Sequence, residues 1–365
     1  MLSFSKIKVV FIYIFFIFIS LFAFLNLQNE NNSVLNKKVN LGLDLQGGSY
    51  LLLEIDTEPL VKERIQSKVV PLKKLLNKNN FSYTNFSISS NKISFNFNDK
   101  DIKKFEKIFF SEKDNILNSY ISKYNNFELD FKLVNDSVEI FFSKFGILNL
   151  NNLALSQSIE IVRRRIDDTG TKEPTILQRG DKRILVELPG IKDPERIKNL
   201  LGKTAQLNFR LVSDEKSEFG FDELISDKGE KLIVNKRIIF SGENLIDAQP
   251  RMDNQTNQPI VSFTLDRLGS QRFGKSTLNN VGKRIAIVLD NQIISAPSIR
   301  EPITGGSGII SGDFSFQEAT DLALLLRSGA LPTPIEIVEE RTVGPDLGQD
   351  SINSGTISLI IGFAL

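Results

Sequence analysis

The stretch 282–348 constrains the fold of this chain more tightly than any other part, because most of its residues have a recognisable local role. It opens with an apolar run at 284–289 that is typical of a buried strand. Asp290 and Asn291 follow, and such a pair favours a two-residue hairpin turn. A β-hairpin is therefore expected at the start of this stretch.

A helix with both ends marked follows the hairpin. Ser315 and Glu318 have the spacing of a capping box, and Gly329 stands where the helix would stop. A strand at 335–343 closes the unit, and the apolar-rich residues 356–365 begin a further segment. These local signals predict an α+β fold.

Composition narrows the classes of function. The 365 residues suffice for about two or three domains. With 45 basic and 44 acidic residues, the net charge of +1 gives no electrostatic reason to expect nucleic-acid binding. The chain has no cysteine and no histidine, which excludes disulfides, zinc sites built on these ligands, and catalysis by either residue. We find no catalytic constellation, metal site or cofactor motif, and we expect no enzyme.

The chain begins with an apolar segment at 9–25, whose 17 uncharged residues are at the short end of the range that spans a bilayer. Lys6 and Lys8 precede it, which favours a cytoplasmic N-terminus. A cleaved signal peptide is the alternative, but the run is long for one and no small side chains follow it. We expect residues 1–27 to form a cytoplasmic N-terminus and membrane anchor, and residues 28–40 a linker to an exported domain.

Residues 59–212 show a repeated order of one helix and two strands. Hairpin turns are expected near residues 90, 135 and 180, so they recur every 45 residues. This period is typical of α-β-β units that stack helices on one face of an antiparallel sheet. Coincidence is the alternative, because the units share little identity. The helices are expected at 60–76, 102–121 and 153–168.

Arg163, Arg164 and Arg165 lie on the third of these helices. They form either a cluster that binds lipid or a partner, or a solvated face. The spacing favours the solvated face, because Arg163 and Arg164 are placed to pair with Asp167 and Asp168 at i,i+4.

Residues 269–276 match the phosphate-binding loop pattern G-x-x-x-x-G-K-[ST] from Gly269 to Ser276. An exported NTPase is therefore one hypothesis, but the context argues against it. A phosphate loop needs a long helix behind it, whereas Asn279 and Gly282 end this helix early. An exported segment would also meet no ATP, so we expect no bound nucleotide.

Three short motifs carry a family resemblance: G-L-D-L-Q-G-G at 42–48, I-V-R-R-R-I-D at 161–167 and R-T-V-G-P-D-L-G at 341–348. Their order and spacing resemble the SecD family, membrane subunits of the bacterial Sec translocon. The resemblance runs from about residue 41 to the end and is weak at 59–151. The motif positions are Asp44, Gly47, Gly48, Arg163, Arg164, Arg165, Arg341, Gly344, Pro345 and Gly348.

The resemblance implies a protein of the bacterial inner membrane that works with SecF, SecYEG and YajC. With SecF, SecD uses the proton-motive force to assist late steps of protein export. Its periplasmic part has a ferredoxin-like α/β base with antiparallel sheets and an inserted α+β head, thought to hold the emerging unfolded polypeptide. On this sequence the base is expected at 41–212, the head at 213–313, the return to the base at 314–348, and the start of a second transmembrane helix at 349–365.

The sequence ends before that second membrane helix is complete. Ten helical residues span about 15 Å, half of a bilayer core of about 30 Å. The proton-relay carboxylate of the family lies in a later membrane helix. The sequence is therefore expected to be a fragment that binds a client without coupling the binding to protons.

Exposed apolar side chains of the head are expected to bind unfolded exported polypeptides. The candidates are Phe263, Phe273 and Ile287, with ordinary head core as the alternative. The head is expected to move where the chain crosses to the base, near 213–220 and 308–312. The hinge candidates are Gly220, Gly308 and Gly312. An envelope-anchored polypeptide-binding or sensor module without transport activity is the alternative function.

Overall fold

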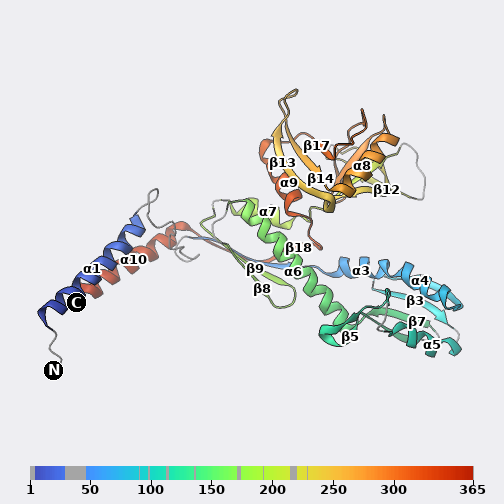
Figure 1. The fold of residues 1–365 in the computed structure, drawn as a ribbon, viewed down its shortest axis with the longest axis horizontal. Coiled ribbons are helices and arrows are strands. Elements are labelled where there is room, and N and C mark those ends of the chain that lie inside the picture. Colours follow the sequence, from blue (N-terminus) through green and yellow to red (C-terminus); the bar gives the residue numbers. More distant parts are fainter. Residues whose placement is uncertain are drawn as a thin grey trace.

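The computed structural model describes residues 5–28, 47–89, 91–97, 99–111, 115–134, 137–170, 174–191, 193–213, 220–227 and 229–364. The molecule is elongated, and helices α1 (Lys6–Gln28) and α10 (Pro345–Ala364) lie at one end of its long axis (Figure 1). Among the residues whose side chains are described, no helix is long and apolar enough to cross a membrane. The membrane anchor and the second membrane helix therefore stay predictions. Of the predicted linker at 28–40, all but its first residue lies outside the described part of the chain.

A four-stranded antiparallel sheet forms the base at the centre of the molecule (Figure 1). Its strands lie in the order β18-β1-β9-β8, and along the chain they alternate with helices as β1-α6-β8-β9-α7-β18. Alternate apolar residues of β1 and β9, such as Leu51 and Val186, are buried in one core with Leu155 of α6 and Leu201 of α7. The elements are β1 (Gly48–Ile55), α6 (Lys144–Asp168), β8 (Thr175–Arg179), β9 (Arg183–Pro189), α7 (Pro194–Gly202) and β18 (Ile335–Val343).

The first two α-β-β units form a domain of their own. Their two hairpins pair through β3 and β7, which gives a sheet of order β2-β3-β7-β6. The helices bury Leu72 and Phe105 against Phe95 and Ile140 of that sheet, in a core separate from that of the base. The predicted order of helices and strands is confirmed, but the third unit belongs to the base sheet. The elements are α3 (Glu58–Ser67), α4 (Val69–Lys78), β2 (Tyr83–Ile88), β3 (Lys92–Phe97), α5 (Asp99–Phe109), β6 (Leu129–Val134) and β7 (Ser137–Phe142), with a minor ribbon of β4 (Tyr120–Ile121) and β5 (Asn126–Phe127).

Two buried polar residues change the helices that periodicity predicted here. Lys68 separates α3 from α4, and its ammonium group pairs with Glu128 at 2.5 Å. The second helix ends at Phe109, well before its predicted end, because the buried amide of Asn118 bonds to the N–H and C=O of Leu129 at 2.7 and 3.1 Å. The chain therefore turns back where a longer helix was expected.

Helix α6 connects this domain to the base (Figure 1). Its N-cap Ser143 accepts a hydrogen bond from the N–H of Gly146 at 2.9 Å. Its first turn lies against β5 and β7, and its later turns bury Ile161, Val162 and Ile166 in the base core. The helix starts nine residues before the predicted 153, because the cap and its contacts lie in the neighbouring domain.

The head lies beside the base and contains two antiparallel sheets and two helices (Figure 1). The larger sheet has the order β11-β12-β10-β15-β16, and the smaller one has the order β13-β14-β17. Apolar side chains of both sheets meet in one core with α8 and α9. The elements are β10 (Leu207–Val212), β11 (Phe221–Ile225), β12 (Lys231–Ser241), β13 (Leu245–Met252), β14 (Pro259–Leu265), α8 (Arg267–Asn279), β15 (Ile285–Leu289), β16 (Gln292–Ser295), β17 (Ser307–Ser311) and α9 (Phe316–Ser328).

The head is larger than predicted at both ends. β10 pairs with β12 and β15, so strand pairing joins residues 207–212 to the head sheet, before the predicted boundary at 213. Helix α9 buries Ala319, Leu322 and Leu326 in the head core, so the return to the base begins after this helix and not at 314. The capping box of α9 is present as predicted, but its apolar stripe packs on the head.

Candidate functional site

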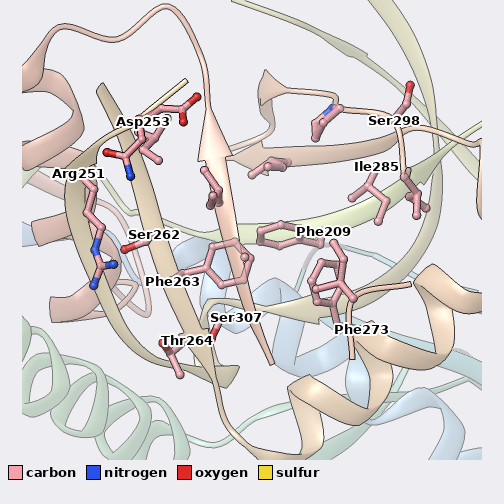
Figure 2. Close-up of a pocket in the computed structure, with 18 of the residues that line it drawn as sticks. Phe209, Arg251, Asp253, Ser262, Phe263, Thr264, Phe273, Ile285, Ser298 and Ser307 are labelled. Carbon is pink, nitrogen blue, oxygen red and sulfur yellow. The ribbon is translucent and has the colours of Figure 1, made fainter. Parts of the chain in front are cut away.

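A cavity of about 690 Å³ lies between the two sheets of the head (Figure 2). Phe209, Ile285 and Ile287 line it from the larger sheet, and Phe263 lines it from β14 of the smaller sheet. Phe273 of α8 completes the apolar floor. A large apolar cavity with few polar groups is the usual form of a binding site for apolar groups.

Aromatic rings make up much of this floor. The ring centroid of Phe209 lies 4.1 Å from that of Phe240 and 5.4 Å from that of Phe263, and Phe273 lies 5.1 Å from Phe240. Figure 2 shows Phe209, Phe263 and Phe273 gathered at the middle of the cavity. Offset and edge-on arrangements of this kind stabilise the cluster beyond the area that it buries.

Of the two interpretations of Phe263, Phe273 and Ile287, ordinary head core is confirmed and an exposed apolar surface is wrong. Their exposed fractions are 3, 4 and 2%, because strands β14 and β15 and helix α8 turn these side chains into the head core. All three nevertheless line the cavity. They could contact a ligand only from inside the head, which is a different arrangement from an apolar outer surface.

Polar side chains also line the cavity, among them Ser262, Thr264 and Ser307 of β14 and β17. Arg251 and Asp253 lie on one side and Ser298 on the other (Figure 2). The Thr256 hydroxyl and the Gln255 backbone N–H donate to the Asp253 carboxylate, which holds the pKa of Asp253 below its usual range. No cluster of three or more metal-ligating carboxylates occurs in the part of the chain that the structure describes.

Gly308 is required by the packing of this cavity, whatever its role as a hinge. It lies in the middle of β17, opposite Phe263 of β14. A Cβ atom at this position would lie 2.4 Å from Cζ of Phe263, so only glycine leaves room for the ring. Gly312, which follows β17, is similarly close to the Phe314 ring at 2.6 Å, and Gly220 directly precedes β11 within the head.

The chain crosses between base and head at 203–206 and 329–331. The predicted crossings at 213–220 and 308–312 are wrong, since strand β10 and helix α9 both still pack within the head. The two observed crossings touch, because the Leu331 N–H donates to the Thr204 carbonyl at 2.8 Å. Any rotation of the head relative to the base therefore requires a change of backbone conformation in these two short segments.

Arg165 of α6, in the base, forms hydrogen bonds to the backbone of both crossings. Its side chain is 1% exposed, and its guanidinium donates to the carbonyls of Leu200 at 2.7 Å, Thr204 at 3.3 Å and Gly329 at 3.2 Å. Burial lowers the pKa of Arg165 to about 10, while the charge of the Asp290 carboxylate acts to raise it. The group therefore stays charged at neutral pH, and the carbonyls of both crossings satisfy most of its donors.

Asp290 holds the first crossing from the side of the head. Its carboxylate accepts hydrogen bonds from the N–H groups of Ala205 at 3.1 Å and Gln206 at 2.8 Å, and from the Thr204 hydroxyl. Asp290 and Asn291 have φ values of 50° and 66°, as the predicted two-residue hairpin turn requires. The hairpin turn that the sequence predicted therefore also binds the crossing at 203–206.

The predicted solvated face on α6 is confirmed for Arg163 and Arg164, which are exposed, and wrong for Arg165, which is buried. The predicted ion pairs differ as well. Arg164 pairs with Glu160 at 3.2 Å, and Asp168 pairs with Arg327 of α9 at 2.8 Å. The signal that was missed is the position of Arg165 four residues after Ile161, within the buried stripe of the helix. A charged residue within an apolar stripe indicates a buried partner.

The phosphate-loop pattern lies inside a helix. Asp266 caps α8 by accepting a hydrogen bond from the N–H of Gly269 at 2.6 Å, so residues 269–276 are helical from their first residue. A phosphate loop would have to precede the helix instead. The sequence context argued against an NTPase, and this geometry supports the same conclusion.

The described residues among the remaining motif positions lie at the end of the base sheet that leads into α10. Gly47 directly precedes β1, and a Cβ atom at Gly48 would lie 2.2 Å from the Leu188 carbonyl oxygen of β9. Arg341 of β18 lies over the Tyr50 ring at 5.9 Å. Gly344 leads into α10, which contains Pro345 and Gly348, whereas Asp44 lies outside the described residues.

Three segments match described families. Residues 216–333 match "SecDF, P1 head subdomain", residues 155–214 match "Protein translocase subunit SecDF, P1 domain, N-terminal", and residues 33–59 match "SecD/SecF GG Motif". Protein translocase subunit SecD of Rickettsia prowazekii is 38% identical over 377 residues, which cover 100% of this chain and 70% of that protein. The chain belongs to the SecD family. Its counterpart in Rickettsia bellii is 41% identical over 336 residues, 89% of this chain and 63% of the relative.

The solved structures agree with this family. A crystal structure of SecDF in a super-membrane-facing form has a TM-score of 0.52 and 27% identity, and the match covers 91% of this chain and 35% of that chain. In the sequence comparisons, the chain spans 63% of the Rickettsia bellii SecD and 70% of the Rickettsia prowazekii SecD. The segment that matches the SecDF head, 216–333, includes α9, in agreement with the packing of this helix on the head core.

Proposed function

We propose that this chain assists protein export across the bacterial inner membrane by holding segments of unfolded polypeptide in the head cavity. The observation that carries the proposal is the cavity of about 690 Å³ with its aromatic and aliphatic floor. Unfolded polypeptides expose apolar side chains, and full burial of one contributes about 1.5–3 kcal/mol. The match of this part of the chain to the SecDF head supports the same role.

In this proposal the chain acts as a binding module and not as an enzyme. α1 anchors it in the inner membrane with a cytoplasmic N-terminus, and α10 begins the second membrane helix, so most of the chain is periplasmic. The order β1-α6-β8-β9-α7-β18 with strands arranged β18-β1-β9-β8 supports the description of the base as ferredoxin-like. SecF, SecYEG and YajC are the proposed partners, and the full-length protein works with SecF on the proton-motive force.

Site-directed photo-cross-linking in membranes that contain the full-length protein tests the proposal. A photo-reactive side chain at Ser298, which is exposed on the cavity rim, should cross-link to an exported protein arrested during translocation. The same side chain at the exposed Ser67 of α3, in the domain with the separate core, should not. Equal labelling at both positions, or none at Ser298, would contradict the proposal.

A further inference from the structure

In the part of the chain that the structure describes, no strand pairs with the outer edge of β17. β17 is the last strand of the sheet β13-β14-β17. The Gly306 carbonyl accepts from the Leu265 N–H at 2.8 Å, and Gly308 lies opposite Phe263. Because bonded residues alternate along an antiparallel pair, 306, 308 and 310 bond to β14. The N–H and C=O groups of Ser307, Ile309 and Ser311 point the other way, and no hydrogen-bond partner is found for them among the described residues.

The sequence of β17 does nothing to protect this edge. Exposed edges are normally blocked by charged residues or proline. The opposite edge of the same sheet, β13, has Asp247, Pro250 and Arg251, whereas β17 reads Ser-Gly-Ile-Ile-Ser. Ile309 is 56% exposed. The edge at β13 is therefore protected against pairing with a further strand, whereas the edge at β17 is not.

Open space follows this unprotected edge along its whole length. The apolar cavity is lined by residues 307–309 of β17 on one side and by Pro297 and Ser298 on the other. A second cavity, of about 1180 Å³, continues past residues 311–313, and Pro297 lines it as well. The two cavities together form a groove between β17 and the segment 295–299.

We propose that an extended segment of unfolded polypeptide binds in this groove by adding a strand to the free edge of β17. Main-chain hydrogen bonds to Ser307, Ile309 and Ser311 would hold the segment, and every second side chain would enter the apolar cavity. Backbone pairing is independent of sequence, which suits a protein that handles many different clients. This inference rests on the proposed function and specifies how the same site recognises its substrate.

Backbone-methylated peptides test strand addition without any change in the protein. The probe is a short fluorescent peptide of alternating leucine and serine, measured by anisotropy with the full chain in lipid nanodiscs and with empty nanodiscs as the control. Two further peptides carry N-methyl groups on the leucine amides or on the serine amides. In an extended strand these two sets of amides face opposite edges, so methylation of only one set should weaken binding, by about tenfold or more.

A matched pair of variants tests the edge from the protein side. Ile309→Pro removes an outward N–H from an edge strand, where proline is tolerated, and should weaken binding of the unmethylated peptide by about fivefold to tenfold. Ile309→Val keeps the N–H group and should bind as the wild type does. An unchanged melting temperature establishes that the proline variant is folded.

The outcomes separate the two claims. If both methylated peptides bind as tightly as the parent peptide, strand addition is overturned while capture of apolar side chains stands. If the parent peptide does not bind at all, both this inference and the proposed function fail. Weakening by both methylated sets equally would also overturn addition to a single edge.

Discussion

At the scale of single residues, Arg165 contributes most to the relative placement of head and base. A buried guanidinium is unfavourable unless its donors are satisfied. Here the two terminal amino groups donate to main-chain carbonyls of α7 and of both crossings, although the buried Nε has no partner among the described residues. The position of Arg165 therefore fixes the backbone at 200–204 and at Gly329 together. Backbone carbonyls do not titrate, so this contact is not expected to respond to physiological changes of pH.

Replacement of Arg165 by methionine should destabilise the protein by about 3–5 kcal/mol, because several buried carbonyls lose their donor. Urea unfolding measures the loss, and hydrogen exchange should show faster exchange of the Leu331 amide. Arg164→Met is the matched control, since the Arg164 side chain is 58% exposed. Its effect should stay within about 0.5 kcal/mol. A similar loss in both variants would contradict the role assigned to Arg165.

At the scale of secondary-structure elements, helix α9 has contacts on two sides. Ala319, Leu322 and Leu326 pack in the head core, while Leu324 and Leu325 contact Leu200 of α7. Its first turn is fixed by the capping box, in which the N–H of Glu318 donates to Ser315 Oγ at 3.2 Å and the N–H of Ser315 donates to Glu318 Oε2 at 2.8 Å. The helix therefore fixes the position of the head sheet relative to α7 of the base.

Ser315→Ala should destabilise the head by about 1 kcal/mol, because the N–H of Glu318 loses its acceptor at the helix N-terminus. The change is measured as a shift of the urea midpoint. Gln317→Ala, at an exposed position in the same turn, is the control and should change stability by only a few tenths of a kcal/mol. Equal effects of the two substitutions would show that the cap is not what stabilises this turn.

At the scale of the whole molecule, the described residues between α1 and α10 form three packed bodies: the domain at 58–142, the base and the head. The phenylalanine-rich core of the first shares no member with the cores of the other two. The base and head are joined through α9, α7 and the two crossings. The domain at 58–142 is connected to the base through β1 at one end and α6 at the other.

This separation predicts that the domain at 58–142 unfolds independently. Phe105 is 0% exposed, and Phe105→Ala should destabilise this domain by about 3–5 kcal/mol. Hydrogen exchange should then accelerate in β3 and β7 and stay unchanged in β9 and β14, with peptide binding to the head intact. Lys103→Ala, an exposed position on the same helix, should change nothing. Acceleration throughout the molecule would contradict independent unfolding.

The sequence by itself determined the features that depend on local chemistry. The capping box and end of α9, the left-handed turn at Asp290 and Asn291, and the helical context of residues 269–276 each depend on a few adjacent residues, so they could be predicted. The alternation of apolar residues likewise predicted the order of helices and strands in the α-β-β units.

Only the tertiary structure decided which surfaces meet. An apolar stripe indicates that a face is buried but does not identify its partner, so α9 was expected in the base and packs on the head. The same limit explains why the sequence left Phe263 and Ile287 open between the surface and the core of the head. It also explains why Arg165 was predicted to be solvated, since its partners are carbonyls far away in the sequence. The free edge of β17 depends on strand order, which arises from pairings between residues far apart in the chain.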